Sequence, residues 1–358
     1  MAWPVTSAAP GCSISWQQDS ARRGRTARYR VRSTALSPDV ANGNSWLLIA
    51  GLGIALYALS VAVFLILENR SPQSTLAWLF VLVLFPPVGL LLYWMFGRSW
   101  HAFSRRGVLR KLMQGSELAE RSARLLAEQP AKLEALERSP IGEYGRLGAM
   151  LWATARAPLT LANRLDILQD ASEKYPRLLT DLASVSRSIH LVYYEFASDA
   201  FTDQVADVLL AKVKEGVEVR ILYDPFGSLT MLSWAYLWRM RNGGVEMYPF
   251  APLYNIHTLS YRNHRKIAVL DGGVAYSGGL NLTEKHLTGP DGLSGWRDTH
   301  ARITGEAVLT LQTVFATMWH NTTGENLFQE QYFPDVLDDV PGVPIQVVSA
   351  GPDSEWKA

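Results

Sequence analysis

The stretch Tyr261-Arg-Asn-His-Arg-Lys-Ile-Ala-Val-Leu-Asp-Gly-Gly-Val-Ala-Tyr-Ser-Gly-Gly-Leu-Asn281 decides how the rest of the chain is interpreted. It contains His-x-Lys-x4-Asp followed by Gly-Gly-x-Asn. The apolar run from Ile267 to Leu270, bounded by charge and glycine, is typical of a buried strand. Because side chains alternate along a strand, His264 and Lys266 should point to one face and Arg265 to the other. An imidazole and an ammonium group would then meet at one spot.

These residue types fit the handling of a phosphate group. The imidazole of His264 could attack phosphorus or protonate a leaving oxygen, while Lys266 and the amide of Asn281 neutralise charge on the other oxygens. Gly278 and Gly279 would let the backbone approach the phosphate without a Cβ in the way. The first motif alone is equally compatible with a solvated basic patch. The Gly-Gly-x-Asn at the end of a second apolar strand favours a site.

Composition narrows the classes of partner. The 358 residues include 34 basic and 33 acidic side chains, a balance that argues against a global nucleic-acid binder. Cys12 is the only cysteine, which excludes disulfides within the chain and multi-cysteine metal sites. Neither a metal nor a cofactor is expected.

The first 45 residues form an arginine-rich segment without hydrophobic periodicity, which predicts a disordered basic tail. An organelle transit peptide and a leader from a misassigned start are the other interpretations of the same composition. A cytoplasmic tail is the preferred one because a membrane segment follows at once.

Two uncharged runs predict a transmembrane helical hairpin over residues 46–97. Trp46–Leu67 has 22 residues, enough at about 1.5 Å per residue to cross a hydrocarbon core of about 30 Å. Leu76–Phe96 should cross again as one helix, kinked at Pro86-Pro87. Arginines precede the first run and follow the second, whereas the loop between them has only Arg70. The positive-inside rule then places both termini in the cytoplasm.

Residues 98–156 are helix-forming and carry both charges, which predicts linker helices that are either solvated or laid along the lipid headgroups. From residue 157 to 325 helix and strand signals alternate, which predicts an α/β domain. Its sheet should be mixed but largely parallel, with helices on both faces. The expected elements are strands 188–196, 216–224, 245–250 and 296–303 and helices 202–215, 229–241 and 306–320.

Other polar residues have a place in this pattern. Asp224 ends a predicted strand, so it should lie at the sheet edge near the loop before His264. Asp298 is a candidate for holding the second nitrogen of His264, with a salt bridge at the strand end as the alternative. Tyr194 and Glu195 are interpreted as core or rim residues.

The combined motifs resemble the cardiolipin synthases of the phospholipase D superfamily. The resemblance runs from about Trp46 to the end and rests on Arg70-Ser-Pro-Gln-Ser-Thr-Leu-Ala-Trp78, Gly216-Val-Glu-Val-Arg-Ile-Leu-Tyr-Asp224, Asn263-His-Arg-Lys266, Gly278-Gly-Leu-Asn281 and Trp296-Arg-Asp-Thr-His300. It implies a phospholipase D-like half-domain in the bacterial inner membrane. The implied reaction joins two phosphatidylglycerols into cardiolipin and releases glycerol through a phosphohistidine, without a metal.

By this resemblance the catalytic residues are His264, Lys266 and Asp271, and the phosphate-binding residues are Gly278, Gly279 and Asn281. Members of the wider superfamily more often have Ser where this chain has Gly279.

The family uses two His-Lys-Asp motifs, whereas this chain has one. Residues 326–358 resemble a linker and the start of a second half, and the strand expected at Ile345 has no evident sheet partner. The chain is therefore either truncated or forms a homodimer in which each copy supplies one motif. Two other functions remain open. One is a phospholipase D-type hydrolase, and the other is a non-catalytic membrane protein that binds anionic lipid through Lys266 and nearby arginines.

Overall fold

A computed structural model describes residues 38–67, 72–96, 112–113, 116–250, 262–289, 296–335 and 342–349. The chain divides into two compact units, Met1–Tyr93 and Trp94–Ala358. Most of the predicted basic tail and the arginines between 98 and 110 lie outside the described residues. The tail prediction ends too late, because the first helix already begins at Pro38.

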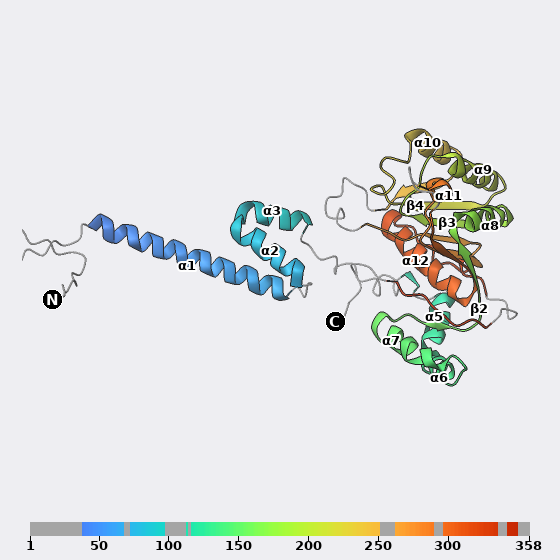
Figure 1. Ribbon diagram of the computed structural model, residues 1–358, viewed down its shortest axis with the longest axis horizontal. Coiled ribbons are helices and arrows are strands. Elements are labelled where there is room, and N and C mark those ends of the chain that lie inside the picture. The colour runs from blue at the N-terminus through green and yellow to red at the C-terminus, as the bar shows by residue number, and fades with distance from the viewer. Residues whose placement is uncertain are drawn as a thin grey trace, which may run out of the picture. The chain divides into compact units, whose positions relative to one another are not determined.

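The first unit contains α1 (Pro38–Leu67), α2 (Pro72–Leu84) and the start of α3 (Pro86–Phe96) (Figure 1). The predicted first span is confirmed in length and composition. Within the part of the chain that the structure describes, Trp46–Leu67 is the one helical stretch long and apolar enough to cross a membrane.

The second apolar run is not the single kinked helix that the sequence predicts. It forms two short helices, and α3 turns back beside α2 (Figure 1). The ring of Tyr93 consequently lies 5.2 Å from that of Trp78, although fifteen residues separate them. Pro86 lacks the N–H that would bond the Leu82 carbonyl, and the hydroxyl of Tyr57 on α1 donates to that carbonyl at 3.1 Å. The proline pair therefore breaks the helix, and α1 satisfies a carbonyl that the break exposes.

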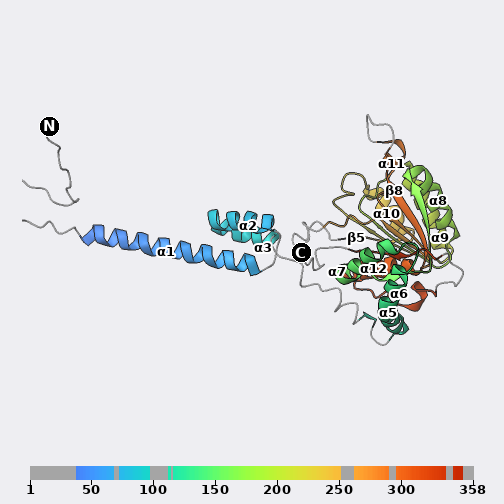
Figure 2. The same cartoon turned by 60° about the horizontal axis from the view of Figure 1, so that its bottom comes forward.

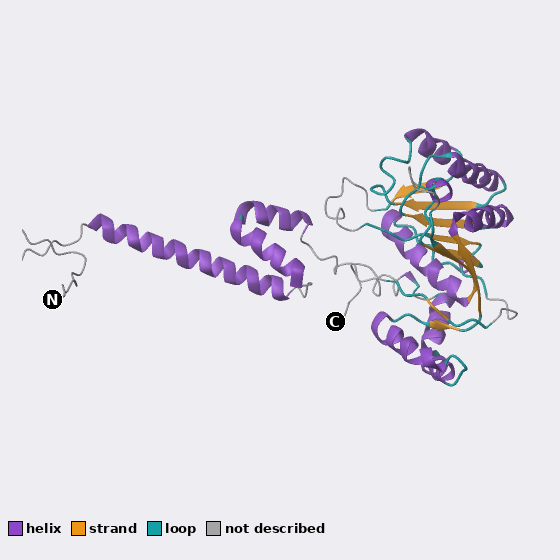
Figure 3. Cartoon of the chain, viewed as in Figure 1, coloured by secondary structure: helices purple, strands orange, loops and turns teal. Residues whose placement is uncertain are grey.

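The second unit is built on a seven-stranded sheet in the order β2-β8-β7-β6-β3-β4-β5 (Figure 3). The strands are β2 (Asn163–Gln169), β3 (Ser188–Tyr193), β4 (Glu218–Tyr223), β5 (Glu246–Pro249), β6 (Ile267–Leu270), β7 (Val274–Gly278) and β8 (Thr299–Gly305).

The prediction of a mixed sheet is confirmed, but the expectation that it is largely parallel is wrong. Only the β3–β4 and β4–β5 pairs are parallel, whereas β2–β8, β8–β7, β7–β6 and β6–β3 are antiparallel. The connection from β6 to β7 has three residues, which is long enough only for antiparallel neighbours.

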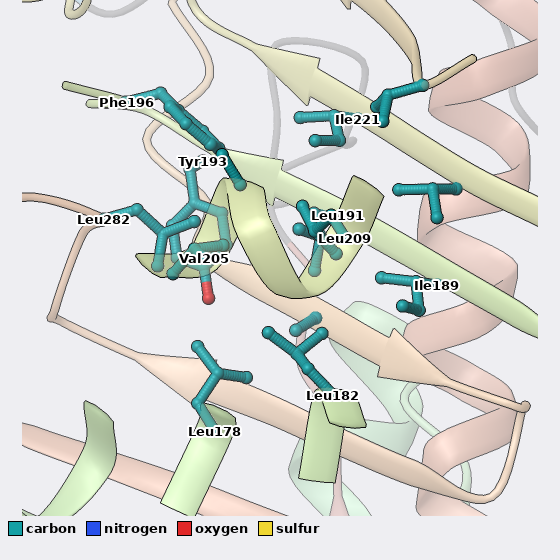
Figure 4. Close-up of a cluster of buried hydrophobic side chains, with 14 of the residues drawn as sticks. Leu178, Leu182, Ile189, Leu191, Tyr193, Phe196, Val205, Leu209, Ile221 and Leu282 are labelled. Carbon is teal, nitrogen blue, oxygen red and sulfur yellow. The ribbon is translucent and has the colours of Figure 1, made fainter. Parts of the chain in front are cut away.

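Helices cover both faces of the sheet, as predicted (Figures 1 and 2). On one face lie α8 (Asp170–Ser184), α9 (Ala200–Lys214) and α10 (Trp234–Asn242), and on the other lies α12 (Glu306–Thr323). Figure 4 shows the first of the two cores, where Leu178 and Leu182 of α8 meet Ile189 and Leu191 of β3. The segment α8 with β2, which the sequence pattern did not predict, completes this core.

The predicted linker region packs onto the domain. It forms α5 (Glu117–Ala127), α6 (Gln129–Glu137), the 3₁₀ turn η2 (Gly142–Tyr144) and α7 (Gly145–Ala155). Leu118 of α5 is buried in the second core, and the side chain of Gln129 exchanges hydrogen bonds with the backbone of Leu159. These helices are thus part of the folded unit.

The strand expected at Ile345 exists and has a partner. It is β9 (Ile345–Gln346), which pairs antiparallel with β1 (Leu159–Thr160). The expectation that it lacks a sheet partner is therefore wrong, because β1 precedes the motif-bearing strands and was not recognised. The remaining short elements are α11 (Lys285–Thr288) and the 3₁₀ turn η4 (Glu330–Tyr332).

Candidate functional site

His264 and Lys266 lie in the extended segment that leads into β6, and both reach the ring of Tyr194. The ring centroids of His264 and Tyr194 are 4.8 Å apart, and the ammonium of Lys266 lies 5.4 Å from the Tyr194 centroid. Arg265 points the other way, where its guanidinium contacts Met318 of α12 at 4.0 Å. The alternation predicted from the sequence therefore holds, and an imidazole and an ammonium share one side of the sheet.

Asp224, at the carboxyl end of β4, fixes the segment before His264. Its carboxylate is fully buried and accepts the backbone N–H of Asn263 at 2.9 Å and a guanidinium N–H of Arg262 at 3.4 Å. It also accepts the backbone N–H of Phe226 at 2.9 Å. Because one carboxylate joins the β4 turn to this segment, the backbone that presents His264 is held in place, as the position of Asp224 in the sequence predicted.

Asn281 is joined to the end of β3 next to Tyr194. Its side-chain oxygen accepts the backbone N–H of Glu195 at 3.1 Å, and the following residue pairs with Glu195 and Ala197 through the backbone. The buried ammonium of Lys174 on α8 supports the residue before Asn281, because it donates to the Leu280 carbonyl at 2.9 Å. With its oxygen engaged, the amide of Asn281 keeps its N–H groups for another acceptor.

The two glycines make room for a neighbouring strand, and their predicted contact with a phosphate stays a prediction. A Cβ on Gly278 would lie 2.5 Å from the Thr299 carbonyl oxygen, and a Cβ on Gly279 would overlap the Asp298 carboxylate. The glycines therefore let β8 and Asp298 come close to this strand.

Asp298 lies near the site, but no hydrogen bond joins it to His264 in the part of the chain that the structure describes. Its carboxylate accepts the backbone N–H of Thr299 at 2.7 Å, and its own N–H donates to Asp170 at 2.9 Å. Burial lowers the pKa of both Lys174 and Lys266, and the negative charge of Asp298 opposes that shift. Asp298 thus acts on this site through its charge.

The site also shifts the proton equilibria of its own residues. Partial desolvation of its ring and the charge of Lys266 lower the pKa of His264, against the opposite effect of Glu195 and Asp224. Burial lowers the pKa of Lys266 to about 8, although Glu195 and Asp298 raise it. At neutral pH the imidazole is therefore unprotonated and able to attack an electrophile, beside a lysine that is still charged.

Asp271, the last residue of the His-x-Lys-x4-Asp motif, is not at this spot. It follows the far end of β6 and adopts a left-handed backbone with φ 50°. Its carboxylate accepts the backbone N–H groups of Ser186, Arg187 and Ser188 at 2.9, 2.8 and 2.8 Å. The structure thus separates Asp271 from His264 and Lys266 by the length of a strand and gives it the contacts of a residue that ties two turns together.

Three contributors to the site were missed in the sequence. Tyr194 and Glu195 were interpreted as core or rim residues, and Lys174 was not singled out because it lies on α8, which was not predicted. Glu195 forms an ion pair with Lys285 and influences both His264 and Lys266. A glutamate directly after a buried strand that runs parallel to the Asp224 strand was the available signal. Among the described residues, no group of three or more His, Cys, Asp or Glu side chains could hold a metal ion.

Two segments match known families. Residues 53–98 match the family described as phospholipase D-nuclease N-terminal, and residues 178–319 match the one described as cardiolipin synthase, PLD-like domain. The second match contains His264, Lys266 and Asn281.

Similar proteins include the cardiolipin synthases of Alkalihalophilus pseudofirmus and Geobacillus kaustophilus. They are 37% and 38% identical to this chain, and each alignment covers 83% of this chain and 58% of the relative. That of Oceanobacillus iheyensis is 35% identical over 87% of this chain and 64% of its own length. The chain therefore spans about three fifths of the length of these relatives. Among solved structures, the phospholipase D family member Nuc from Salmonella typhimurium matches 45% of this chain and 96% of its own, with 16% identity and a TM-score of 0.35.

Proposed function

We propose that this chain, which belongs to the cardiolipin synthase family of phospholipase D-like proteins, is a membrane-bound phosphatidyltransferase. It would join two molecules of phosphatidylglycerol into cardiolipin and release glycerol. The observation that carries the proposal is the convergence of His264, Lys266 and the Asn281 amide around Tyr194 and the end of β3. A nucleophile, a cation and an amide donor together suit a phosphodiester.

In the first step, a ring nitrogen of His264 forms a bond to phosphorus while the bond from phosphorus to the glycerol oxygen breaks. The ammonium of Lys266 and the amide of Asn281 stabilise the charge that develops on the non-bridging oxygens. In the second step, the hydroxyl of another phosphatidylglycerol attacks phosphorus, the bond to nitrogen breaks and His264 is regenerated.

A second ionisable group has to protonate the departing glycerol oxygen and then take the proton from the attacking hydroxyl. The 358 residues contain one His-x-Lys motif, so we propose that the other histidine comes from outside them, either from a second copy across a twofold interface or from a second half of the same protein. Sedimentation analysis in detergent would test the stoichiometry. Activity that is proportional to protein concentration in a monodisperse monomer would contradict this arrangement.

We place the site on the cytoplasmic side of a bacterial inner membrane, because arginines flank the apolar segments on both sides. This arrangement requires the chain to cross the bilayer a second time between Leu67 and Arg98, so α2 and α3 would have to straighten into one span there. Cys12 reports on the location of the tail, since it is the only cysteine. Labelling of Cys12 by an impermeant maleimide added from the outside would place the tail on the outer side.

The full chain reconstituted with radiolabelled phosphatidylglycerol tests the reaction. We expect cardiolipin and glycerol in equal amounts and an acid-labile phosphoprotein, both absent in His264→Ala. His320→Ala is a matched control, because His320 lies on α12 and bonds the carbonyl of Glu325. Phosphatidic acid in place of cardiolipin would favour the hydrolase. The absence of every product at all oligomeric states would contradict intrinsic activity.

A further inference from the structure

Large apolar side chains stand exposed around the carboxyl edge of the parallel strands, beside the candidate site. We call them the edge patch. It comprises Phe226, Leu229, Trp234, Trp238, Leu287 and Trp296, whose exposed fractions lie between 37% and 74%. They come from the β4–α10 turn, the first turns of α10, α11 and the residues before β8. A soluble domain rarely exposes so much aromatic surface in one area, so this patch has a partner.

The edge patch is attached to the residues that hold His264. The backbone N–H of Phe226 bonds the same Asp224 carboxylate that holds Asn263. A Cβ on the next residue, Gly227, would lie 2.9 Å from ring atoms of Tyr194, and that ring also contacts His264 and Lys266. The exposed Phe226 is therefore connected to the segment that carries His264 through Asp224 and Tyr194.

Hydrogen bonds to the loop after β3 hold the other members at the same edge. The backbone N–H of Ser233, which caps α10, donates to the Ser198 hydroxyl at 2.8 Å. The backbone N–H of Glu284, which precedes α11, donates to Asp199 at 2.6 Å. Trp296 packs its ring edge-on against His286 of α11 at 4.8 Å. Loops from three parts of the chain thus bring the six side chains to one edge.

The chemistry of the patch fits one occupant, a lipid bilayer. Tryptophan has an apolar ring with a polar N–H, which is why it is enriched at the boundary between headgroups and hydrocarbon. Trp234 and Trp238 are four residues apart, so they lie on one face of α10, about 6 Å along its axis. This separation between the two rings is comparable to the ~5–10 Å depth to which interfacial helices bury their apolar face. The same chain carries an apolar segment long enough to span a bilayer, which favours a lipid surface over other occupants.

We propose that the edge patch inserts into the headgroup region of the bilayer and so holds the open side of the His264 site against the lipid surface. A phosphodiester headgroup would then reach His264 without the lipid leaving the membrane. The docking requires no turnover, so it goes beyond the proposed reaction and can be tested separately from it.

Nitroxide labels at single cysteines test the docking in the full chain. In a Cys12→Ser background, Trp234→Cys, Trp238→Cys and Lys214→Cys are labelled and the protein is placed in nanodiscs of phosphatidylglycerol and phosphatidylethanolamine. Lys214 is an exposed matched control, because it lies at the opposite end of the parallel strands. We expect the ratio of oxygen to nickel-complex collision rates to be several-fold higher at 234 and 238 than at 214.

Two results would overturn the proposal. A collision ratio at 234 equal to that at 214 would show that the patch faces water. Low rates for both reagents at 234 would show that protein covers it, most simply a second copy of the chain. Introducing His264→Ala into the labelled proteins should leave all three ratios unchanged, which separates docking from catalysis. Thermal melting of each labelled variant confirms that the domain is folded, as expected for exposed positions.

Discussion

The two ends of β6 carry the two halves of one sequence motif and have opposite properties. At the entry, Lys266 is buried, has its pKa lowered to about 8 and lies against an aromatic ring that it shares with an exposed histidine. At the exit, burial alone would raise the pKa of Asp271, but hydrogen bonds from Ser186, Ser188 and Arg187 lower it. The surroundings of Lys266 disfavour its charged form, whereas the surroundings of Asp271 favour its charged form.

The difference shows that two residues of one sequence motif need not have the same role in the structure. The four residues of β6 separate Lys266 from Asp271 by the length of the strand, so a motif that begins at a site ends at the opposite edge of the sheet. Perturbed ionisation is typical of functional positions, whereas a carboxylate with several backbone donors is typical of structural ones. We therefore expect chemical and structural effects of substitution to separate along this strand.

The largest effect is expected from His264→Ala, which removes the nucleophile. Cardiolipin formation should fall at least about a thousandfold, since losing a residue that forms the covalent intermediate removes the reaction path itself. The free energy of unfolding should stay within about 0.5 kcal/mol of the wild type, because the side chain is exposed. Initial rates and urea unfolding on the same preparations measure both. Retained activity would remove His264 from the mechanism.

Lys266→Met should lower kcat about a hundredfold, because it removes a cation that stabilises the charge developing on the phosphoryl oxygens. Since the ammonium is partly desolvated, a thioether of similar length should be tolerated without loss of the fold. Lys214→Met, an exposed lysine at the far edge, is the control and should change nothing. An equal loss in both variants would mean that general positive charge, and not this lysine, is required.

The pH dependence of kcat/KM should follow from the ionisation of Lys266. With a pKa of about 8, Lys266 loses its proton as pH rises through that value, so kcat/KM should fall above it. The pKa of His264 lies below its usual value, so its unprotonated form persists to lower pH than for an ordinary histidine. A rate profile from pH 5 to 10 should show the alkaline limb near pH 8. In Lys266→Arg this limb should move upward, because a guanidinium keeps its proton.

Much of this arrangement could be predicted from local pattern. The apolar run 267–270 and the alternation of His264 and Lys266 predicted a strand and a shared face, and both are observed. What could not be predicted depends on partners remote in sequence. Asp298 fills the space that Gly279 leaves, and Lys174 supports the loop from a helix about a hundred residues earlier. The antiparallel direction of β6 and β7 was readable from their three-residue connection, whereas the antiparallel β2–β8 pair was hidden because β2 was not predicted.

The smallest effect on turnover, and the clearest effect on stability, is expected for Asp271→Asn. An amide cannot replace the charge that accepts three backbone N–H groups, so unfolding should cost about 1 to 3 kcal/mol less. Activity per folded molecule should stay near the wild-type value, because Asp271 lies at the opposite end of β6 from His264. The surface variant Asp207→Asn, which loses an exposed pair with Arg239, should change stability by less than about 1 kcal/mol.

The pH dependence of that stability difference identifies its origin. Because the folded pKa of Asp271 is lowered, its contribution is fully present above the unfolded value of about 3.9 and is lost as pH falls through the folded pKa. Wild type and Asp271→Asn should therefore differ at pH 7 and converge in acid. A difference that persists unchanged at pH 2 would mean that the substitution acts through packing. A loss of turnover in the folded variant would show that Asp271, like His264 and Lys266, is needed for the reaction.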